Sequence, residues 1–275
     1  MNIKHSKTLG PRESRLITSL YEANKQVFKL KDVKDILAVK EAAAANIVSR
    51  LNAKGIITRV KQGLYSIVPF DMGKETVYAP DANITAREIM DGKDYYIAFA
   101  SALQLHDMTT QPQLTNYTAV LKQKPQVKAA GYEYKFVNLN KKSFFGIEDF
   151  WINKQEKIKI SDPEKTIIDC LNHPEYCGGV SEAAKAMYIK KDSIIIEKLV
   201  DYAVKLDKGS VCARLGYLLE LYKPANDNNL NLLRQRPGKS YVLLDPTMPK
   251  SGKYLNRWRL LLNVDMEELS NIGRT

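Results

Sequence analysis

Residues 11–68 contain an ordered series of short patterns that few folds accommodate. Three stretches carry apolar residues at helical spacing, at about residues 12–24, 32–37 and 40–54. Asp32 is expected to cap the second helix, and Gly55 to follow the end of the third. A β-hairpin is then predicted, with strands at residues 56–60 and 64–68 around a Lys61-Gln62-Gly63 turn. Three helices followed by a hairpin is the order of a winged helix-turn-helix.

The third helical stretch has two distinct faces. One face is apolar and is expected to pack on the first two helices; it comprises Ala44, Ile47, Val48 and Leu51. The opposite face is small and polar and comprises Ala42, Asn46, Ser49 and Ala53, flanked by Ala43 and Arg50. Small side chains on an exposed face let a helix approach the floor of the major groove of DNA, where Asn can pair with adenine and Arg with guanine.

These features predict a DNA-binding surface on the third helix and the hairpin. We expect Asn46, Ser49 and Arg50 to contact bases, and the cations at the helix ends and the wing to contact phosphates. The full predicted set is Lys40, Ala42, Ala43, Asn46, Ser49, Arg50, Lys54, Arg59, Lys61 and Gln62. The alternative is a winged helix that docks on another protein through an ordinary polar face.

The charge distribution favours a polyanionic partner. The chain of 275 residues has a formal net charge of +11, and residues 1–70 hold 13 basic but only 5 acidic residues. A basic excess concentrated in one small region is typical of a nucleic-acid-binding module, although a solvated basic face has the same composition. No apolar stretch approaches the length of a membrane span, and no apolar segment follows the basic N-terminus, so we expect a cytoplasmic protein without a membrane partner.

The rest of the chain predicts a larger mixed domain. Pro69 ends the hairpin and a polar linker follows, so the expected domains are residues 1–72 and 73–275. Strands are expected mainly between residues 117 and 160 and helices mainly between 163 and 221, which indicates an α+β class. Tyr95–Leu105 is expected to be one largely buried helix, and a final sheet segment is expected at 241–244, before residues 258–264.

Few residues in this larger domain suggest chemistry. Asp162, Glu164 and Asp169 would suit a metal-dependent nuclease only if they converged on one cation. A capping box formed by Ser161 or Asp162 with Glu164, next to Pro163, explains the same pattern as a helix start. The Gly178-Gly179 pair before a helix suggests a tight turn, or else an anion site. Three cysteines without a zinc-site spacing suggest buried thiols. No catalytic residue, metal or cofactor is therefore expected.

A series of short motifs resembles the AbiEi-type antitoxins of type IV toxin–antitoxin and abortive-infection operons. The resemblance covers nearly the whole chain and lies in the order of the pieces. The pieces are Arg59–Tyr65, Tyr95-Tyr96-Ile97, Ser101-Ala102-Leu103 with His106, Thr109–Pro112, Phe145-Gly146, Ser161–Asp169, Gly178-Gly179, Arg214–Glu220, Leu244-Asp245-Pro246 and Arg257-Trp258.

The resemblance implies a winged helix that binds inverted repeats in its own promoter and represses the operon. It implies a C-terminal domain that counters a nucleotidyltransferase-like toxin without forming a stable complex with it. The protein would be a monomer in solution or a dimer on DNA, with no enzyme activity of its own. Lys165 and Arg214 match motif positions, and we expect both to be structural. The alternative is a winged-helix transcriptional regulator whose C-terminal domain senses a small ligand.

Overall fold

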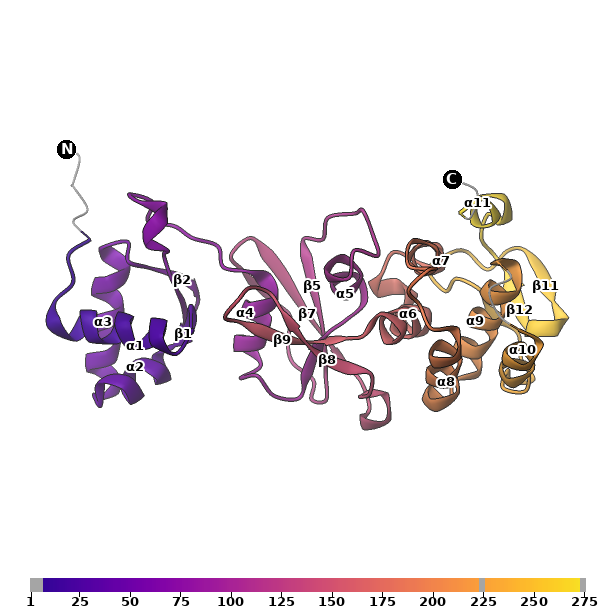
Figure 1. Ribbon diagram of the computed structural model, residues 1–275, viewed down its shortest axis with the longest axis horizontal. Helices are drawn as coiled ribbons and strands as arrows, with labels where there is room; N and C mark the ends of the chain where they lie inside the picture. Colours follow the sequence, from indigo (N-terminus) through magenta and orange to yellow (C-terminus); the bar gives the residue numbers. More distant parts are fainter. Residues whose placement is uncertain (1–6, 223–225, 273–275) are drawn as a thin grey trace. The chain divides into compact units, whose positions relative to one another are not determined.

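The computed structural model describes residues 7–222 and 226–272 (Figure 1). The chain divides into two compact units. The first comprises Met1–Tyr95, Pro125–Lys135 and Asp149–Ile158, and the second comprises Tyr96–Lys124, Phe136–Glu148 and Lys159–Thr275. Helices and three separate sheets are both present, so the predicted mixed α+β class is confirmed. Within the described residues, no helix is long and apolar enough to cross a membrane.

The amino-terminal segment, residues 7–68, has the predicted order of elements (Figure 1). These are α1 (Pro11–Glu22), β1 (Val27–Lys29), α2 (Leu30–Leu37), α3 (Glu41–Ala53), β2 (Ile57–Lys61) and β3 (Leu64–Ile67). Strand β3 lies between β1 and β2 in an antiparallel sheet. All four residues of the predicted apolar face of α3 are buried, with at most 2% of each exposed. They pack with Leu16, Leu20 and Phe28 in one core.

The start of α2 differs from the prediction. The helix begins at Leu30, so Asp32 lies in its first turn instead of preceding it. The Asp32 carboxylate accepts a hydrogen bond of 2.6 Å from the backbone N–H of Lys29, the residue before the helix. The carboxylate thus satisfies a backbone donor at the helix start from inside the helix, which is the other half of a capping arrangement.

The first unit does not end at residue 72, where the sequence suggested a boundary. The Thr58 hydroxyl on β2 donates to the carbonyl of Thr76 at 3.3 Å and accepts from the N–H of Tyr78 at 3.0 Å. A β-carbon on Gly55 would lie 2.4 Å from the side chain of Thr76, so the two segments pack closely. Contacts between residues distant in sequence hold the expected linker against the hairpin, and a composition pattern cannot reveal them.

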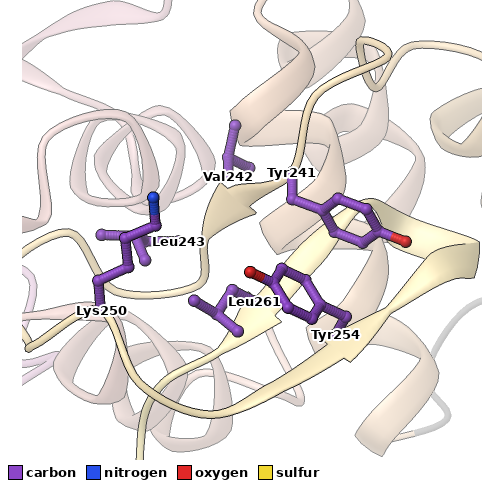
Figure 2. Close-up of a pocket in the computed structure, with 6 residues that line it drawn as sticks. All are labelled: Tyr241, Val242, Leu243, Lys250, Tyr254 and Leu261. Atoms are coloured by element: carbon purple, nitrogen blue, oxygen red, sulfur yellow. The ribbon is translucent and has the colours of Figure 1, made fainter.

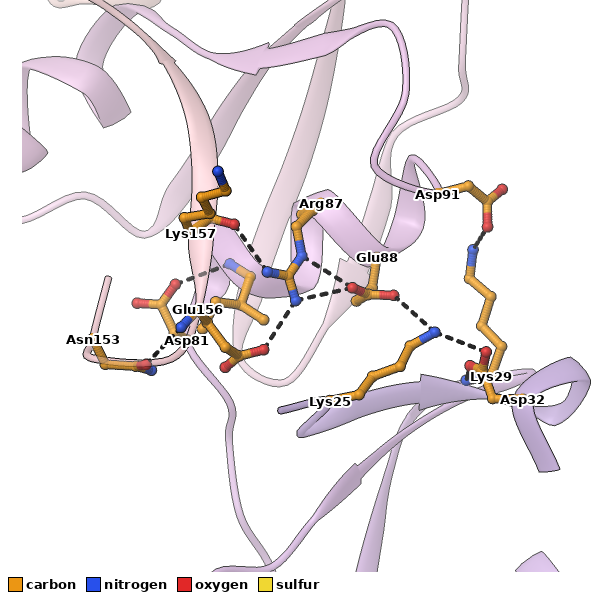
Figure 3. A network of polar contacts seen from close by, with 11 residues as sticks. Lys25, Lys29, Asp32, Asp81, Arg87, Glu88, Asp91, Asn153, Glu156 and Lys157 are labelled. Atoms are coloured by element: carbon orange, nitrogen blue, oxygen red, sulfur yellow. Dashed lines mark hydrogen bonds and ion pairs between the residues drawn. The ribbon is translucent and has the colours of Figure 1, made fainter. Parts of the chain in front are cut away.

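Ion pairs within the first unit join the amino-terminal segment to α4 (Ala82–Ile89) and the turn after it (Figure 3). Lys25 lies 2.7 Å from Asp32 and 3.9 Å from Glu88, and Lys29 pairs with Asp91. Arg87 on α4 pairs with Glu88 and, at 2.9 Å, with Glu156. Two lysines that contribute to the basic excess of the first 70 residues are therefore neutralised locally.

The largest sheet has six strands in the order β6-β7-β5-β4-β9-β8. The strands are β4 (Tyr95–Ile97), β5 (Thr115–Val120), β6 (Val127–Ala129), β7 (Tyr132–Asn138), β8 (Ile147–Trp151) and β9 (Lys157–Ser161). The prediction of one helix over Tyr95–Leu105 is wrong, because β4 comes first and α5 (Phe99–Leu105) follows. An unbroken apolar run does not distinguish a buried strand from a buried helix, although the β-favouring Tyr-Tyr-Ile stretch is where the strand lies.

The carboxyl-terminal part of the second unit is helical with a small sheet. The helices are α6 (Pro163–Asn172), α7 (Val180–Ile189), α8 (Ile196–Leu206), α9 (Gly209–Tyr222), α10 (Asp227–Arg234) and α11 (Met266–Asn271). The sheet has the order β10-β12-β11, with β10 (Val242–Leu243), β11 (Lys253–Leu255) and β12 (Leu260–Leu262). Trp258, in the turn between β11 and β12, is fully buried against Gly216 of α9. This tryptophan anchors the small sheet, named here the carboxyl-terminal sheet, on the helices.

Candidate nucleic-acid interface

Helix α3 presents a face of small and amide side chains to solvent. Ala42, Asn46, Ser49 and Ala53 are exposed as predicted, and Ala43 is half-buried at the edge of the face. Ala45 is also exposed, although the sequence analysis did not include it in the set. A face without bulky side chains can closely approach the base edges on the floor of a DNA groove. An amide side chain on that face can both donate and accept a hydrogen bond.

A buried carboxylate holds two of the predicted DNA-binding cations. Glu13 of α1 is only 4% exposed and lies 2.6 Å from the Lys54 ammonium and 3.6 Å from Arg50 Nε. Burial alone would raise the pKa of Glu13, but hydrogen bonds from the Gly10 N–H and from Lys54, with the charge of Arg50, hold that pKa below its usual value. Lys54 also donates to the carbonyl of Thr8. Lys54 therefore joins α3 to α1, whereas Arg50 keeps 61% of its side chain exposed.

The β2–β3 hairpin carries the other predicted residues and packs beside α3. Arg59 and Gln62 are exposed and Lys61 is half-buried. Gly63 has φ of +76°, a left-handed conformation that favours glycine, and this closes the turn. The pairing shifts register between Arg59 and Lys61, which marks a bulge in β2.

The basic residues of the amino-terminal segment fall into two groups. Lys25, Lys29, Lys34, Arg50 and Lys54 each form an ion pair. Within residues 7–222 and 226–272, no ion pair involves Lys7, Arg12, Arg15, Lys31, Lys40, Arg59 or Lys61. Three of this second group, Lys40, Arg59 and Lys61, flank the small face of α3 in the predicted set. Cations without an ion pair thus lie at the start of α3 and along the hairpin, and also on α1 and α2.

Two of the carboxylates considered for a nuclease, Asp162 and Glu164, share an ion pair with Lys198, at 3.2 Å and 2.8 Å. Asp162 caps α6 by accepting from the Lys165 N–H at 2.8 Å, and it also accepts from the Tyr202 hydroxyl. Glu164 accepts from the N–H of Ile195 and from Lys198 instead of closing the expected capping box. Among the described residues, no three side chains of His, Cys, Asp or Glu are grouped so as to hold a metal ion.

The third of these carboxylates, Asp169, belongs to a fully buried polar group. It pairs with Lys165 and accepts from the Tyr96 hydroxyl at 3.0 Å. Burial, and then the charge of Asp169, raise the pKa of Tyr96 well above its usual value. Each polar atom of the trio finds a partner within the core, which is the condition for burying charge at a tolerable cost. The sequence offered a signal for the ion pair only in its i, i+4 spacing along α6.

Two further motif positions have internal partners. Asp245, which is 1% exposed, accepts from the N–H of Val180 at the start of α7, so a carboxylate of the chain occupies the place where Gly178-Gly179 suggested an anion. Arg214 donates to the carbonyls of Leu171 and Leu243. Desolvation lowers the pKa of its buried guanidinium. The three cysteines are buried thiols.

An open pocket of about 510 Å³ lies on the carboxyl-terminal sheet. Its lining comprises Tyr241, Val242, Leu243, Lys250, Tyr254 and Leu261. Figure 2 shows the two tyrosine rings at one end and Lys250 at the other, with Leu261 between them. No sequence pattern indicated this site, because its residues come from three strands and the loops beside them, which only the fold brings together.

Comparison with known proteins supports the fold. No protein-family model and no curated protein matches the chain. The crystal structure of the RV2827C protein from Mycobacterium tuberculosis is similar over 98% of this chain and 97% of that one, with a TM-score of 0.67 and 12% sequence identity. The two chains therefore share an architecture along their whole length, while their surface side chains are free to differ.

Proposed function

We propose that the amino-terminal segment is a winged helix that binds duplex DNA, with α3 in the major groove and the β2–β3 hairpin on the neighbouring backbone. The observation that carries this proposal is the exposed small face of α3 with Lys40, Arg59 and Lys61 beside it, three cations that form no ion pair among the described residues. A winged helix that binds another protein would not require a small face bordered by unpaired cations. Apolar anchor residues contribute more to a protein interface, whereas cations contribute more to binding a phosphate backbone.

Each part of this surface has a distinct role in the proposed complex. Ala42 and Ala45 allow close approach, and the Asn46 amide pairs with an adenine edge. Arg50 is exposed enough to reach a guanine, but it must give up its contact with Glu13 to do so. Lys40, Arg59 and Lys61 bind phosphates and fix the register of the helix without selecting a sequence.

We further propose that the protein is a type IV antitoxin that represses its own operon. The resemblance to AbiEi-type antitoxins supports this role, which assigns repression to the winged helix and antitoxicity to the rest of the chain. Two protomers would occupy an inverted repeat in the promoter. The C-terminal domain would counter a nucleotidyltransferase-like toxin without forming a stable complex with it.

Two assays on the full chain separate these roles. A reporter placed behind the protein's own upstream sequence should be repressed by the wild type and released by a Lys40→Ala, Arg59→Ala, Lys61→Ala triple variant. The same triple variant should still rescue growth when the neighbouring toxin gene is expressed from an unrelated promoter. Repression that survives the triple variant contradicts the DNA-binding surface, and wild-type protein that fails to rescue contradicts the antitoxin role.

A winged-helix regulator with a ligand-sensing C-terminal domain is the second candidate, and the pocket on the carboxyl-terminal sheet favours it. The volume of about 510 Å³ lies within the range of small-molecule sites. A metabolite that both raises the melting temperature of the protein and changes its affinity for the upstream sequence would support a sensor. Repression unchanged by every metabolite that binds would contradict it.

A further inference from the structure

Side chains from the three strands of the carboxyl-terminal sheet form a row along its open pocket. Leu243 of β10 is paired with Leu261 of β12, and Leu261 is paired with Tyr254 of β11. Residues paired across neighbouring strands project from the same face of a sheet. The floor is therefore a short apolar row that ends in a tyrosine ring, and the fold fixes it on three strands.

The aromatic end of this row remains open to solvent. Tyr254 is 64% exposed and Tyr241 is 36% exposed, with ring centroids 4.7 Å apart at an interplanar angle of 70°. The Arg259 guanidinium lies 5.6 Å from the Tyr241 ring centroid. The Tyr254 ring is mostly open to solvent and Tyr241 stands edge-on to it, so the face of Tyr254 offers a platform for a planar group.

The surroundings of the platform are strongly basic. Residues 235–264 contain six basic residues and one acidic residue. The basic residues are all exposed, namely Arg236, Lys239, Lys250, Lys253, Arg257 and Arg259. The acidic residue, Asp245, is buried at the start of α7 and so lies away from solvent. Arg236 and Arg257 pair with Asp207 and Glu220, which leaves four cations without an ion pair among the described residues.

We propose that this face is a second nucleic-acid-binding site, which takes single-stranded nucleic acid. An unpaired base stacks on Tyr254 over the apolar row, while Lys250 of the pocket lining and Arg259 beside the Tyr241 ring bind the phosphates on either side. Aromatic stacking with a cationic border is the general chemistry by which proteins hold single strands. A duplex hides its base faces, so it cannot use the tyrosine platform. This site is independent of α3, and its proposed ligand differs from that of α3.

Fluorescence anisotropy of the full-length protein with a labelled 12-nucleotide oligothymidylate tests this site. Tyr254→Ala should weaken binding between about 5-fold and 150-fold, the range expected for loss of one stacked ring. Tyr254→Phe keeps the ring and should bind within twofold of the wild type. Lys250→Ala should reduce the salt dependence of log K by about 0.7, the loss of one phosphate contact on a single strand.

Two controls separate this site from the amino-terminal surface. The assay is repeated in the Lys40→Ala, Arg59→Ala, Lys61→Ala background, where single-strand binding through the carboxyl-terminal sheet should persist. Tyr254→Ala should leave the melting temperature and the affinity for the upstream duplex unchanged. Photo-crosslinking with an iodouracil-substituted oligonucleotide should label Tyr241 or Tyr254. Three results would overturn the proposal. The crosslinks could be confined to residues 40–62, or Tyr254→Ala could bind the oligonucleotide as tightly as the wild type. Free thymidine monophosphate could also displace the labelled strand at the same concentration as an unlabelled strand does.

Discussion

The exposed face of α3 and the open face of the carboxyl-terminal sheet are both basic, yet they present opposite kinds of side chain. The α3 face is built from alanines, Ser49 and Asn46, whereas the sheet presents Tyr241 and Tyr254 over an apolar row. Small side chains suit a close approach to a groove, and exposed rings suit an unpaired base. Positive charge alone thus indicates a polyanion, while the neighbouring side chains determine which form of nucleic acid fits.

The two faces also differ in how the fold supports them. The buried Glu13 carboxylate links α1 to α3 by ion pairs with Arg50 and Lys54, whose side chains are partly exposed. Trp258 supports the second face by complete burial against α9, with its indole N–H donated to Glu220 at 2.8 Å. Packing of a large ring tolerates less change than a partly solvated ion pair. Because of these differences, we expect substitutions that disrupt one face to leave the other face intact.

The largest effect is expected from Gly216→Ala on the second face. The new β-carbon would lie 2.2 Å from ring carbons of the buried Trp258, so the ring and the sheet it anchors must shift. We expect a loss of about 3 kcal/mol in the free energy of unfolding measured with urea, together with weaker single-strand binding. Gly238→Ala is the matched control, since nothing lies within 4 Å of its added β-carbon. Unchanged stability in Gly216→Ala would contradict the anchoring role of Trp258.

On the first face, Asn46→Ala tests base recognition. Loss of one bidentate amide contact should reduce the preference for the upstream sequence over a scrambled duplex by about 1–3 kcal/mol, with binding to the scrambled duplex unaffected. Competition electrophoresis measures this preference. Asn52→Ala serves as the control, because this residue is exposed on the same helix but rotated by roughly 120° from Asn46. An equal effect of the two substitutions would remove Asn46 from the recognition surface.

The contribution of the Glu13 ion pairs to the stability of the first face is tested by measuring the unfolding of Glu13→Gln at several pH values. The folded-state pKa of Glu13 lies below its usual value, so its contribution to stability is fully present above about pH 4.3, the unfolded pKa of Glu. That contribution is lost as the pH falls through the lower folded-state value. We expect Glu13→Gln to cost about 1–2 kcal/mol at pH 7 and progressively less below pH 4, as followed by urea unfolding. A cost that is the same at pH 7 and at pH 3 would argue against the ion pairs.

The smallest effect is expected from Lys61→Ala on the hairpin. One lost phosphate contact should lower the salt slope of duplex binding by about 0.9 and weaken all sequences alike. Lys31→Ala removes an exposed cation of α2 and should leave the slope unchanged. The measurement is a titration of duplex binding at several salt concentrations. If Lys61→Ala alters the sequence preference but not the salt slope, the hairpin does not contact the DNA backbone.

Local patterns were sufficient to predict the amino-terminal segment. The spacing of Ala44, Ile47, Val48 and Leu51 identified the buried face of α3, and thereby its exposed face. The same approach failed over Tyr95–Leu105, where a continuous apolar run has no period that separates strand from helix. It also could not foresee that Lys54 would be held by Glu13, because that contact depends on how α1 and α3 pack.

The carboxyl-terminal sheet shows a second limit of sequence patterns. The charge count placed most of the excess in the first 70 residues, and the basic residues after 235 did not stand out in the total. Their importance becomes visible only when Asp245 is found buried and Tyr241 and Tyr254 are found together. Both the burial of Asp245 and the contact between the two tyrosines depend on packing between residues distant in sequence. Gly178-Gly179 is a parallel case, since the anion at the start of α7 comes from 65 residues further along the chain.

We propose above all that α3 and the β2–β3 hairpin bind duplex DNA. The most direct test is the salt dependence of full-length protein binding to its own upstream duplex, compared between the wild type and the Lys40→Ala, Arg59→Ala, Lys61→Ala triple variant. We expect a linear fall of log K with log salt for the wild type, and a slope smaller by about 2.7 for the triple variant, or about 0.9 for each lost phosphate contact. A wild-type affinity that does not respond to salt, or an identical slope in the two proteins, would contradict this proposal.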